Sequence, residues 1–269
     1  MTSRTAGSKT AAEGFFQEPA VRTPLLKSLR RWLPASVRRR MRALLPRGTP
    51  AASLAGRSPA DAFGTIYREG MWGSSIGSGE RYCSGIGSRD AAIVEPYVAE
   101  VRSWLGRLPA PPAVVDLGCG DFHVGSQVRG ACGRYVACDC VPALIEHNRS
   151  RWAHLDVDFR VHDATSAPAP EADVVFIRQV LQHLSNELVE KVLRGIEGRY
   201  QWAVVTEHVP AGDFPPNVDK PLGPDVRLSV GSGVVVTEPP FGLRPLDSQV
   251  ICDIDFEGSR ITTVAYRLR

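Results

Sequence analysis

The chain has 269 residues, enough for one domain with extensions or for two small domains. Hydrophobic residues make up 43% and charged residues 23%, which are globular proportions and exclude a wholly disordered protein. No apolar run approaches the 18 residues of a membrane-spanning helix. The six cysteines lack Cys-x-x-Cys pairs and no leader is recognisable, so we expect reduced thiols, no structural zinc site and a cytoplasmic protein.

The net charge of +3 hides two oppositely charged parts. Residues 1–60 hold 12 Lys and Arg against 2 Asp and Glu, whereas residues 61–269 hold 20 against 27. We therefore predict a basic N-terminal extension, 1–60, followed by a mildly acidic domain, 61–269. The acidic balance of the domain gives no indication that it binds nucleic acid.

Within the extension, apolar residues recur at helical spacing over 24–45, with arginines between them and Pro34 in the middle. This pattern predicts a basic amphipathic helix, and the Pro- and Gly-containing residues 46–60 are typical of a linker. A helix of this kind packs on its own domain, builds a homodimer with a second subunit, or makes peripheral contact with an anionic membrane. These alternatives stay open.

Short β-branched runs alternate with helical patterns in the domain. Helices are expected over 91–108 and from Leu181 to Ile196, and strands over 114–117, 135–138, 157–161, 174–177 and 202–206. Such alternation implies a doubly wound parallel sheet covered on both faces. Three further strands are expected over 230–236, 249–255 and 261–268, the last two joined near Gly258 as an antiparallel edge. The predicted fold class is α/β.

The first strand runs into a glycine-rich turn, Ala113-Val-Val-Asp-Leu-Gly-Cys-Gly-Asp-Phe122. Gly118 and Gly120 let the backbone approach a ligand without a Cβ in the way, and the turn presents N–H groups to a polar or anionic group. The third glycine of a dinucleotide fingerprint would fall on His123, which disfavours NAD. A P-loop sequence is also missing.

Acidic residues follow the next two strands. Asp139 is placed to accept hydrogen bonds from the two hydroxyls of a ribose, and Asp163 to accept one from an adenine amino group. Because the carboxyl ends of parallel strands share one edge of the sheet, the loop and both acids are expected to converge there.

These residues resemble the class I S-adenosylmethionine (SAM)-dependent methyltransferases from about residue 61 onward. The matching segments are Val115-Asp-Leu-Gly-Cys-Gly120, Cys138-Asp139, His162-Asp163-Ala164 and Asp173-Val-Val-Phe-Ile-Arg-Gln-Val-Leu-Gln-His-Leu184. The resemblance implies a seven-stranded Rossmann-like sheet and SAM as cofactor. It also implies that the loop of Gly118 and Gly120 holds the methionine end above Asp116, with Asp139 at the ribose, Asp163 and Ala164 at the adenine, and Gln179 near the sulfonium. Asp121-Phe122 departs from the family, in which many members carry a third glycine here.

The flanking segments are similar to a group of bacterial small-molecule O-methyltransferases that includes the methylmannose 1-O-methyltransferase of mycobacteria. The matching segments include Trp72-Gly73, Ser84-Gly-Ile-Gly-Ser88, Thr206-Glu-His208, Pro216-Asn-Val-Asp-Lys220, Gly223-Pro-Asp-Val-Arg227 and Pro239-Pro-Phe241. This resemblance implies O-methylation of a sugar or of a similar polar small molecule.

Methyl transfer to a hydroxyl needs a base or a metal, because a hydroxyl ionises far above neutral pH. His183, beyond the fourth strand, is the first candidate for the base, and Glu207 and His208 at the end of the fifth strand are the alternatives. Glu207, His208 and Asp219 also offer ligands for a divalent metal such as Mg²⁺, although their spacing matches no strict motif.

Candidate acceptor-binding residues lie on both sides of the glycine loop in the sequence. The ring of Trp72 is expected to stack on the cofactor or on a sugar face, or to form core. The polar candidates for sugar recognition are Asn217, Asp219, Lys220 and Arg227.

The nearest alternative function is N-methylation of a protein or of another amine. The Asn/Asp-Pro-Pro-aromatic tetrad that N-methyltransferases acting on bases or glutamine often carry after the fourth strand is replaced here by Ile177-Arg-Gln-Val180. The run from Gln179 to Leu184 nevertheless resembles one found in protein N-terminal methyltransferases, which keeps this alternative open. A SAM-binding module without catalysis is disfavoured, because polar residues gather on the acceptor side as well.

Overall fold

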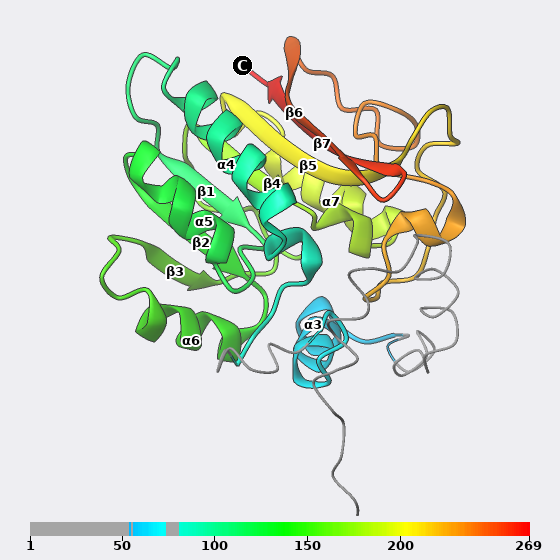
Figure 1. Ribbon diagram of the computed structural model, residues 1–269, viewed down its shortest axis with the longest axis horizontal. Coiled ribbons are helices and arrows are strands. Elements are labelled where there is room, and N and C mark those ends of the chain that lie inside the picture. Colours follow the sequence, from blue (N-terminus) through cyan, green and yellow to red (C-terminus); the bar gives the residue numbers. More distant parts are fainter. Residues whose placement is uncertain (1–53, 55, 74–80) are drawn as a thin grey trace, which may run out of the picture. The chain divides into compact units, whose positions relative to one another are not determined.

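The computed structural model describes residue 54 and residues 56–73 and 81–269 (Figure 1). The predicted amphipathic helix over 24–45 lies outside the described residues, as does most of the predicted linker. The helix α3 begins within that linker at Pro59, where the Ser58 hydroxyl accepts a hydrogen bond from the Asp61 amide and caps the first turn. Among the helices of the described part, none is long and apolar enough to cross a membrane.

The described helices, 3-10 turns and strands follow one another along the chain as in other doubly wound α/β proteins. They are α3 (Pro59–Arg68), η2 (Ile86–Ser88), α4 (Ala91–Leu105), β1 (Val114–Leu117), α5 (His123–Val128), η3 (Arg129–Ala131), β2 (Tyr135–Asp139), α6 (Pro142–Arg151), β3 (Asp158–Val161), β4 (Val174–Arg178), η4 (Leu181–His183), α7 (Asn186–Ile196), β5 (Trp202–Pro210), η5 (Arg227–Val230), β6 (Asp247–Phe256) and β7 (Ser259–Arg267).

The strands form one seven-stranded sheet in the order β3-β2-β1-β4-β5-β7-β6. The first five strands pair in parallel, and β7 enters antiparallel between β5 and β6. The predicted α/β fold, with its antiparallel C-terminal edge and a turn near Gly258, is therefore confirmed. The hydroxyls of Thr206 and Thr263 meet across the β5–β7 pair at 2.9 Å, so the polar groups of this buried junction satisfy each other.

Successive side chains of each strand point to opposite faces of the sheet, so a separate hydrophobic core forms on each face. Val115 and Leu117 of β1 pack with α3 and α7, whereas Val114 packs with α4 and α5 on the other face. Figure 1 shows α4 and α5 together on one side of the sheet and α7 behind β5 on the other. Both faces being covered explains why these strands have continuous apolar sequences.

Two sequence predictions differ from the structure. The predicted strand over 230–236 is a turn and loop, because Gly231 is left-handed (φ 65°) and the Asn217 side chain accepts from the Val235 amide, which thereby joins no sheet. The predicted helix from Leu181 to Ile196 is divided into η4 and α7. The chain is extended at Ser185, and an Asp219 carboxylate oxygen accepts the first free amide of α7, that of Asn186, at 2.8 Å.

Phe122 stands in a backbone conformation that usually requires glycine. Its φ is 60°, yet its side chain is fully buried, with ring centroids 4.9 Å from Phe159 and 5.5 Å from Tyr135. Gly125 leaves the space, since a Cβ there would collide with the Phe122 ring. Aromatic packing thus offsets the cost of the left-handed conformation, which is about 1–2 kcal/mol.

This balance predicts an unusual order of stabilities. Phe122→Ala loses the ring and keeps the unfavourable φ, so we expect it to lower the free energy of unfolding by about 3–5 kcal/mol. Phe122→Gly loses the same ring but relieves the backbone, and should be the more stable of the two by about 1 kcal/mol. Urea denaturation followed by circular dichroism measures both. A glycine variant less stable than the alanine variant would contradict this account.

Candidate functional site

The carboxyl ends of β1, β2, β4 and β5 lie along one edge of the sheet, and the predicted site residues follow them there. This is the edge at which doubly wound sheets bind ligands, because helix N-termini and loop amides face outward beyond it. The prediction that the glycine loop and the strand-end acids converge on one edge follows directly from this topology.

The glycine loop needs both of its glycines. Gly118 and Gly120 have φ of 73° and 57°, and a Cβ on either would come within 2.5 Å of a neighbour, Val180 for Gly118 and Ser84 for Gly120. The amides of Gly118 and Cys119 donate to the Cys138 carbonyl, which ties the loop to β2. Both positions therefore require glycine, because the backbone is left-handed there and a neighbouring side chain lies against it.

Asp139 ends β2 directly beside this loop. Its carboxylate accepts from the Gly120 amide at 3.1 Å and from the Val141 amide at 3.0 Å. Burial raises the pKa of Asp139 to about 6, against the lowering effect of these backbone amides. Because an ionised carboxylate offers about four acceptor positions, these amides do not use all of them, and a polyol hydroxyl could still donate to it.

Asn148 on α6 completes the support of the loop and was not predicted from the sequence. It is fully buried, and its amide donates to the Gly120 carbonyl at 2.7 Å. No local sequence signal pointed to it, because α6 has no apolar periodicity and the partner of Asn148 is 28 residues away.

The other cofactor candidates have well-defined partners. Asp116 faces the α4–α5 side, accepts from the Tyr135 hydroxyl at 3.0 Å, and has its pKa raised by burial to about 7. Asp163 closes a turn by accepting from the amide and hydroxyl of Thr165, and Ala164 lies next to it, half-buried. Gln179 is left-handed (φ 54°), with its amide donating to the Thr206 carbonyl at 2.7 Å.

An aromatic cluster from the N-terminal side covers His183. The Trp72 ring lies with its centroid 4.9 Å from the imidazole, and Phe63 of α3 approaches the imidazole at 6.5 Å. The Trp72 indole donates to the Pro224 carbonyl at 3.0 Å, which joins this cluster to the loop after β5. Trp72 is therefore part of the wall beside His183.

The hydrogen bonds of Gln182 define the tautomer of His183. The side-chain oxygen of Gln182, Oε1, accepts a hydrogen bond from the His208 backbone amide at 3.1 Å. The side-chain NH₂ group of Gln182 is therefore directed to His183 Nε2, at 3.4 Å. With Nε2 as acceptor, the proton of the neutral ring is assigned to Nδ1, which is buried and makes no well-formed hydrogen bond to the described residues, although backbone carbonyls of Gly223, Pro224 and Asp225 lie near the ring. Burial, aided by the charge of Lys220, lowers the pKa of His183 to about 3, so the ring is neutral near pH 7.

Glu207, at the end of β5, is buried with one carboxylate oxygen unused. Oε1 accepts from the Leu181 amide at 3.2 Å, whereas Oε2 has no hydrogen-bond partner among the described residues. Burial raises the pKa of Glu207 to about 8, with the Leu181 amide and the charge of Arg227 acting in the opposite direction. His208 differs, because its Nε2 contacts the Ser259 hydroxyl at 2.6 Å and its ring packs on Phe256 in the β6–β7 hairpin.

The loop of residues 217–227 lies beside these groups and is held by its own polar side chains. The side-chain NH₂ group of Asn217 donates to the carbonyls of Val235, Glu238 and Pro239. The Asp219 carboxylate accepts a hydrogen bond from the backbone amide at the start of α7. Arg227 is fully buried and donates to the carbonyls of Val218 and Leu184. The Lys220 ammonium donates to the carbonyls of Pro221 and His183, and burial lowers its pKa to about 8.

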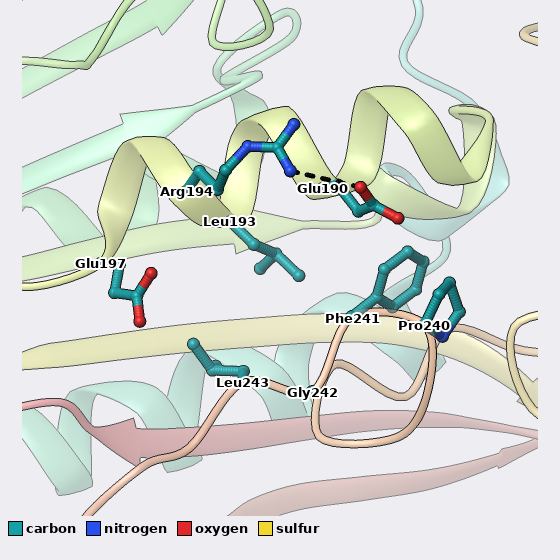
Figure 2. Close-up of a pocket in the computed structure, with 8 residues that line it drawn as sticks. All are labelled: Glu190, Leu193, Arg194, Glu197, Pro240, Phe241, Gly242 and Leu243. Carbon is teal, nitrogen blue, oxygen red and sulfur yellow. Dashed lines mark hydrogen bonds and ion pairs between the residues drawn. The ribbon is translucent and has the colours of Figure 1, made fainter.

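The described part of the chain shows no second centre of this kind. Outside the masked residues, no group of three or more His, Cys, Asp or Glu side chains is arranged to hold a metal ion. A hollow of about 170 Å³ between α7 and the 240–243 loop is lined by Glu190, Arg194 and Phe241 among others (Figure 2). It contains none of the predicted site residues.

These observations fit the cofactor that the sequence implies. The loop turns tightly at Gly118 and Gly120, with Val180 and Ser84 packed against it, and the Asp139 carboxylate lies beside it. Such a pairing of loop and acid suits the methionine and ribose parts of SAM.

Comparison with known proteins agrees with this assignment. Residues 114–198 match the model of a methyltransferase domain family, whereas no curated protein matches the chain at a significant level. Among solved structures, the 1,6-didemethyltoxoflavin N1-methyltransferase of Burkholderia thailandensis has a TM-score of 0.51 at 17% identity, over 79% of this chain and 92% of that one.

Two other similar structures align less well. Human N-acetylserotonin methyltransferase gives a TM-score of 0.49 at 17% identity, over 84% of this chain and 64% of that one. The kinase-methyltransferase WbdD gives 0.47 at 17% identity, over 67% of this chain. This chain spans only 41% of WbdD and 25% of phosphoethanolamine N-methyltransferase 1 of Haemonchus contortus.

The matched stretch runs from β1 to the end of α7 and so contains the glycine loop, Asp139 and Asp163. Residues 114–198 are thus similar to a methyltransferase domain over the stretch that carries the SAM-binding candidates.

Proposed function

We propose that this enzyme transfers the methyl group of SAM to a hydroxyl of a sugar-like polar small molecule, with Glu207 as the general base and His183 as a hydrogen-bond donor to the acceptor. The observation that carries this proposal is Glu207 Oε2, a buried oxygen on β5 that accepts no hydrogen bond from the part of the chain that the structure describes. SAM supplies an electrophilic methyl group, so the protein has to orient the hydroxyl and remove its proton.

Glu207 is the best supported of the three candidate bases. Its free oxygen gives the hydroxyl proton a destination, and its raised pKa of about 8 makes the ionised carboxylate a better base than an ordinary one. The His183 lone pair at Nε2 is directed to the Gln182 amide, and the His208 ring contacts Ser259. We therefore assign proton removal to Glu207.

His183 suits the complementary task. Its ring packs against Trp72, and its buried Nδ1 makes no well-formed hydrogen bond to the described residues, so an acceptor oxygen there would satisfy an Nδ1–H donor. The neutral state of the ring keeps this donor in the same form across the usual assay range, because its pKa is about 3.

The walls of this region suit a polar acceptor with an apolar face. Trp72 offers a ring surface, and the Lys220 ammonium has three N–H donors, of which two contact the carbonyls of His183 and Pro221. We assign Asn217, Asp219 and Arg227 the task of holding the 217–227 loop in place, since their side chains bind its backbone and that of its neighbours.

The cofactor assignment predicts a loss of affinity in Asp139→Asn. The amide loses the charge and an acceptor position toward the ribose, so we expect SAM to bind at least about tenfold more weakly by calorimetry. Asp158→Asn, on the exposed end of β3, is the matched control and should bind SAM as the wild type does. Unchanged affinity in Asp139→Asn would remove Asp139 from the site.

Transfer of labelled methyl groups from SAM to a panel of neutral sugars tests the base. The value of kcat/KM should rise with pH through about 8, because Glu207 must be ionised and its pKa is raised to that value. Glu207→Gln should lower kcat by about 10²–10⁴-fold and abolish the rise while SAM affinity is retained. Glu197→Gln, on the exposed end of α7, is the control.

The product defines the function itself. An O-methyl group, located by NMR, supports the proposal, whereas methylation only of amines in a matching panel replaces it with the N-methyltransferase alternative. A Glu207→Gln variant that keeps the pH dependence would assign the base elsewhere.

The role of His183 is tested by His183→Phe, which keeps a ring against Trp72 and removes the Nδ1–H donor. We expect the KM of the acceptor to rise by about tenfold, corresponding to the loss of one hydrogen bond, with SAM affinity and the pH of half-maximal activity unchanged. A shift of that pH toward acid or alkali would instead show that His183 carries the titrating proton.

A further inference from the structure

Residues 82–90 cross the carboxyl edge of the sheet between the aromatic cluster and α4, and we call this segment the strap. Ser84 lies directly above the glycine loop, since a Cβ on Gly120 would come within 2.5 Å of the Ser84 hydroxyl. Gly87 lies against Gln179, because a Cβ there would collide with the Gln179 amide. The strap thus rests on the two places assigned to the methionine end and the sulfonium of SAM.

Asp121 fastens one end of this strap to the loop. Its carboxylate Oδ2 accepts from the Ser84 amide at 3.0 Å and from the Arg89 guanidinium at 2.6 Å, and its amide donates to the Ser84 hydroxyl at 2.9 Å. The Asp121 side chain is 5% exposed and that of Arg89 24%, so solvent screens the pair only weakly. The Ser84 hydroxyl also contacts the Tyr67 hydroxyl of α3 at 3.0 Å.

Arg178, at the end of β4, fastens the middle of the strap. Its guanidinium donates to the Gly87 carbonyl and, at 3.3 Å, to the Ser88 hydroxyl, and it stacks on the Tyr97 ring at 4.7 Å. Both anchors come from strand ends that also carry the cofactor candidates. The position of the strap is therefore coupled to the loop on which SAM is expected to lie.

We propose that Asp121 is a positioning residue for cofactor binding, which holds the strap as a preformed wall over the methionine end of SAM. The proposal rests on the assignment of Gly120 and Gln179 to the cofactor. A wall that is already fixed costs little ordering entropy when the ligand arrives, so releasing it weakens binding. The effect should be confined to the part of SAM that the strap covers.

Asp121→Asn isolates this role. The Asp121 carboxylate also accepts the His123 amide at the start of α5, and asparagine preserves such a cap while losing the charged bond to Arg89. Arg89→Met removes the partner from the strap side, and Arg89→Lys is the conservative variant that retains a cation. The matched control is Asp156→Asn, which breaks the exposed pair with Arg129.

Calorimetry with two ligands, without any acceptor, separates positioning from a general structural effect. SAM carries the methionine end, and 5′-methylthioadenosine lacks its amino and carboxyl groups. We expect Asp121→Asn and Arg89→Met to lower the affinity for SAM by at least about tenfold, and that for methylthioadenosine by less than about twofold. The double variant should bind SAM no more weakly than either single variant does. Arg89→Lys should recover most of the loss.

Hydrogen exchange reports on the strap itself. The amides of Ser84 and Ser88 should exchange faster in Asp121→Asn than in the wild type, while those of β1 stay protected. Equal losses for SAM and methylthioadenosine, or unchanged SAM affinity with a loosened strap, would overturn the proposal. Because no acceptor is present, failure of O-methylation leaves this test unaffected, and Asp139→Asn tests the cofactor assignment separately.

Discussion

The cofactor side of the site depends on how the backbone of Gly120 is held. Its amide donates to Asp139 at the end of β2, its carbonyl accepts from Asn148 of α6, and its bare α-carbon faces Ser84. Three separate parts of the chain therefore meet on one residue that has no side chain. The φ of 57° and the close approach of Ser84 together require glycine at this position.

On the acceptor side, removal of water sets the protonation states. Burial raises the pKa of Glu207 to about 8, lowers that of Lys220 to about 8 and lowers that of His183 to about 3, so in each group the neutral form gains. Arg227 stays charged, since two backbone carbonyls accept its hydrogen bonds. Its charge favours ionised Glu207, and so Arg227 offsets part of the cost of the carboxylate that the proposed reaction needs.

Local patterns were sufficient to predict β1 to β5, the antiparallel edge and the glycine loop, because each depends on residues adjacent in sequence. Two failures have non-local causes. Val234 and Val236 are buried as a strand's residues would be, but from a loop whose backbone pairs with Asn217. Asn148 was missed for the same reason, since its partner Gly120 is 28 residues away and helical periodicity carries no record of that contact.

The departure of Asp121-Phe122 from the usual glycine has a consequence for both faces of the loop. Phe122 directs its ring into the core beneath α4 and α5, and Asp121 directs its carboxylate to Ser84 and Arg89. A glycine at either position would remove these side-chain contacts and would give the turn more conformational freedom. With both side chains engaged, the loop is fixed from within the sheet and from the strap, and a loop fixed in advance loses less entropy when a ligand binds.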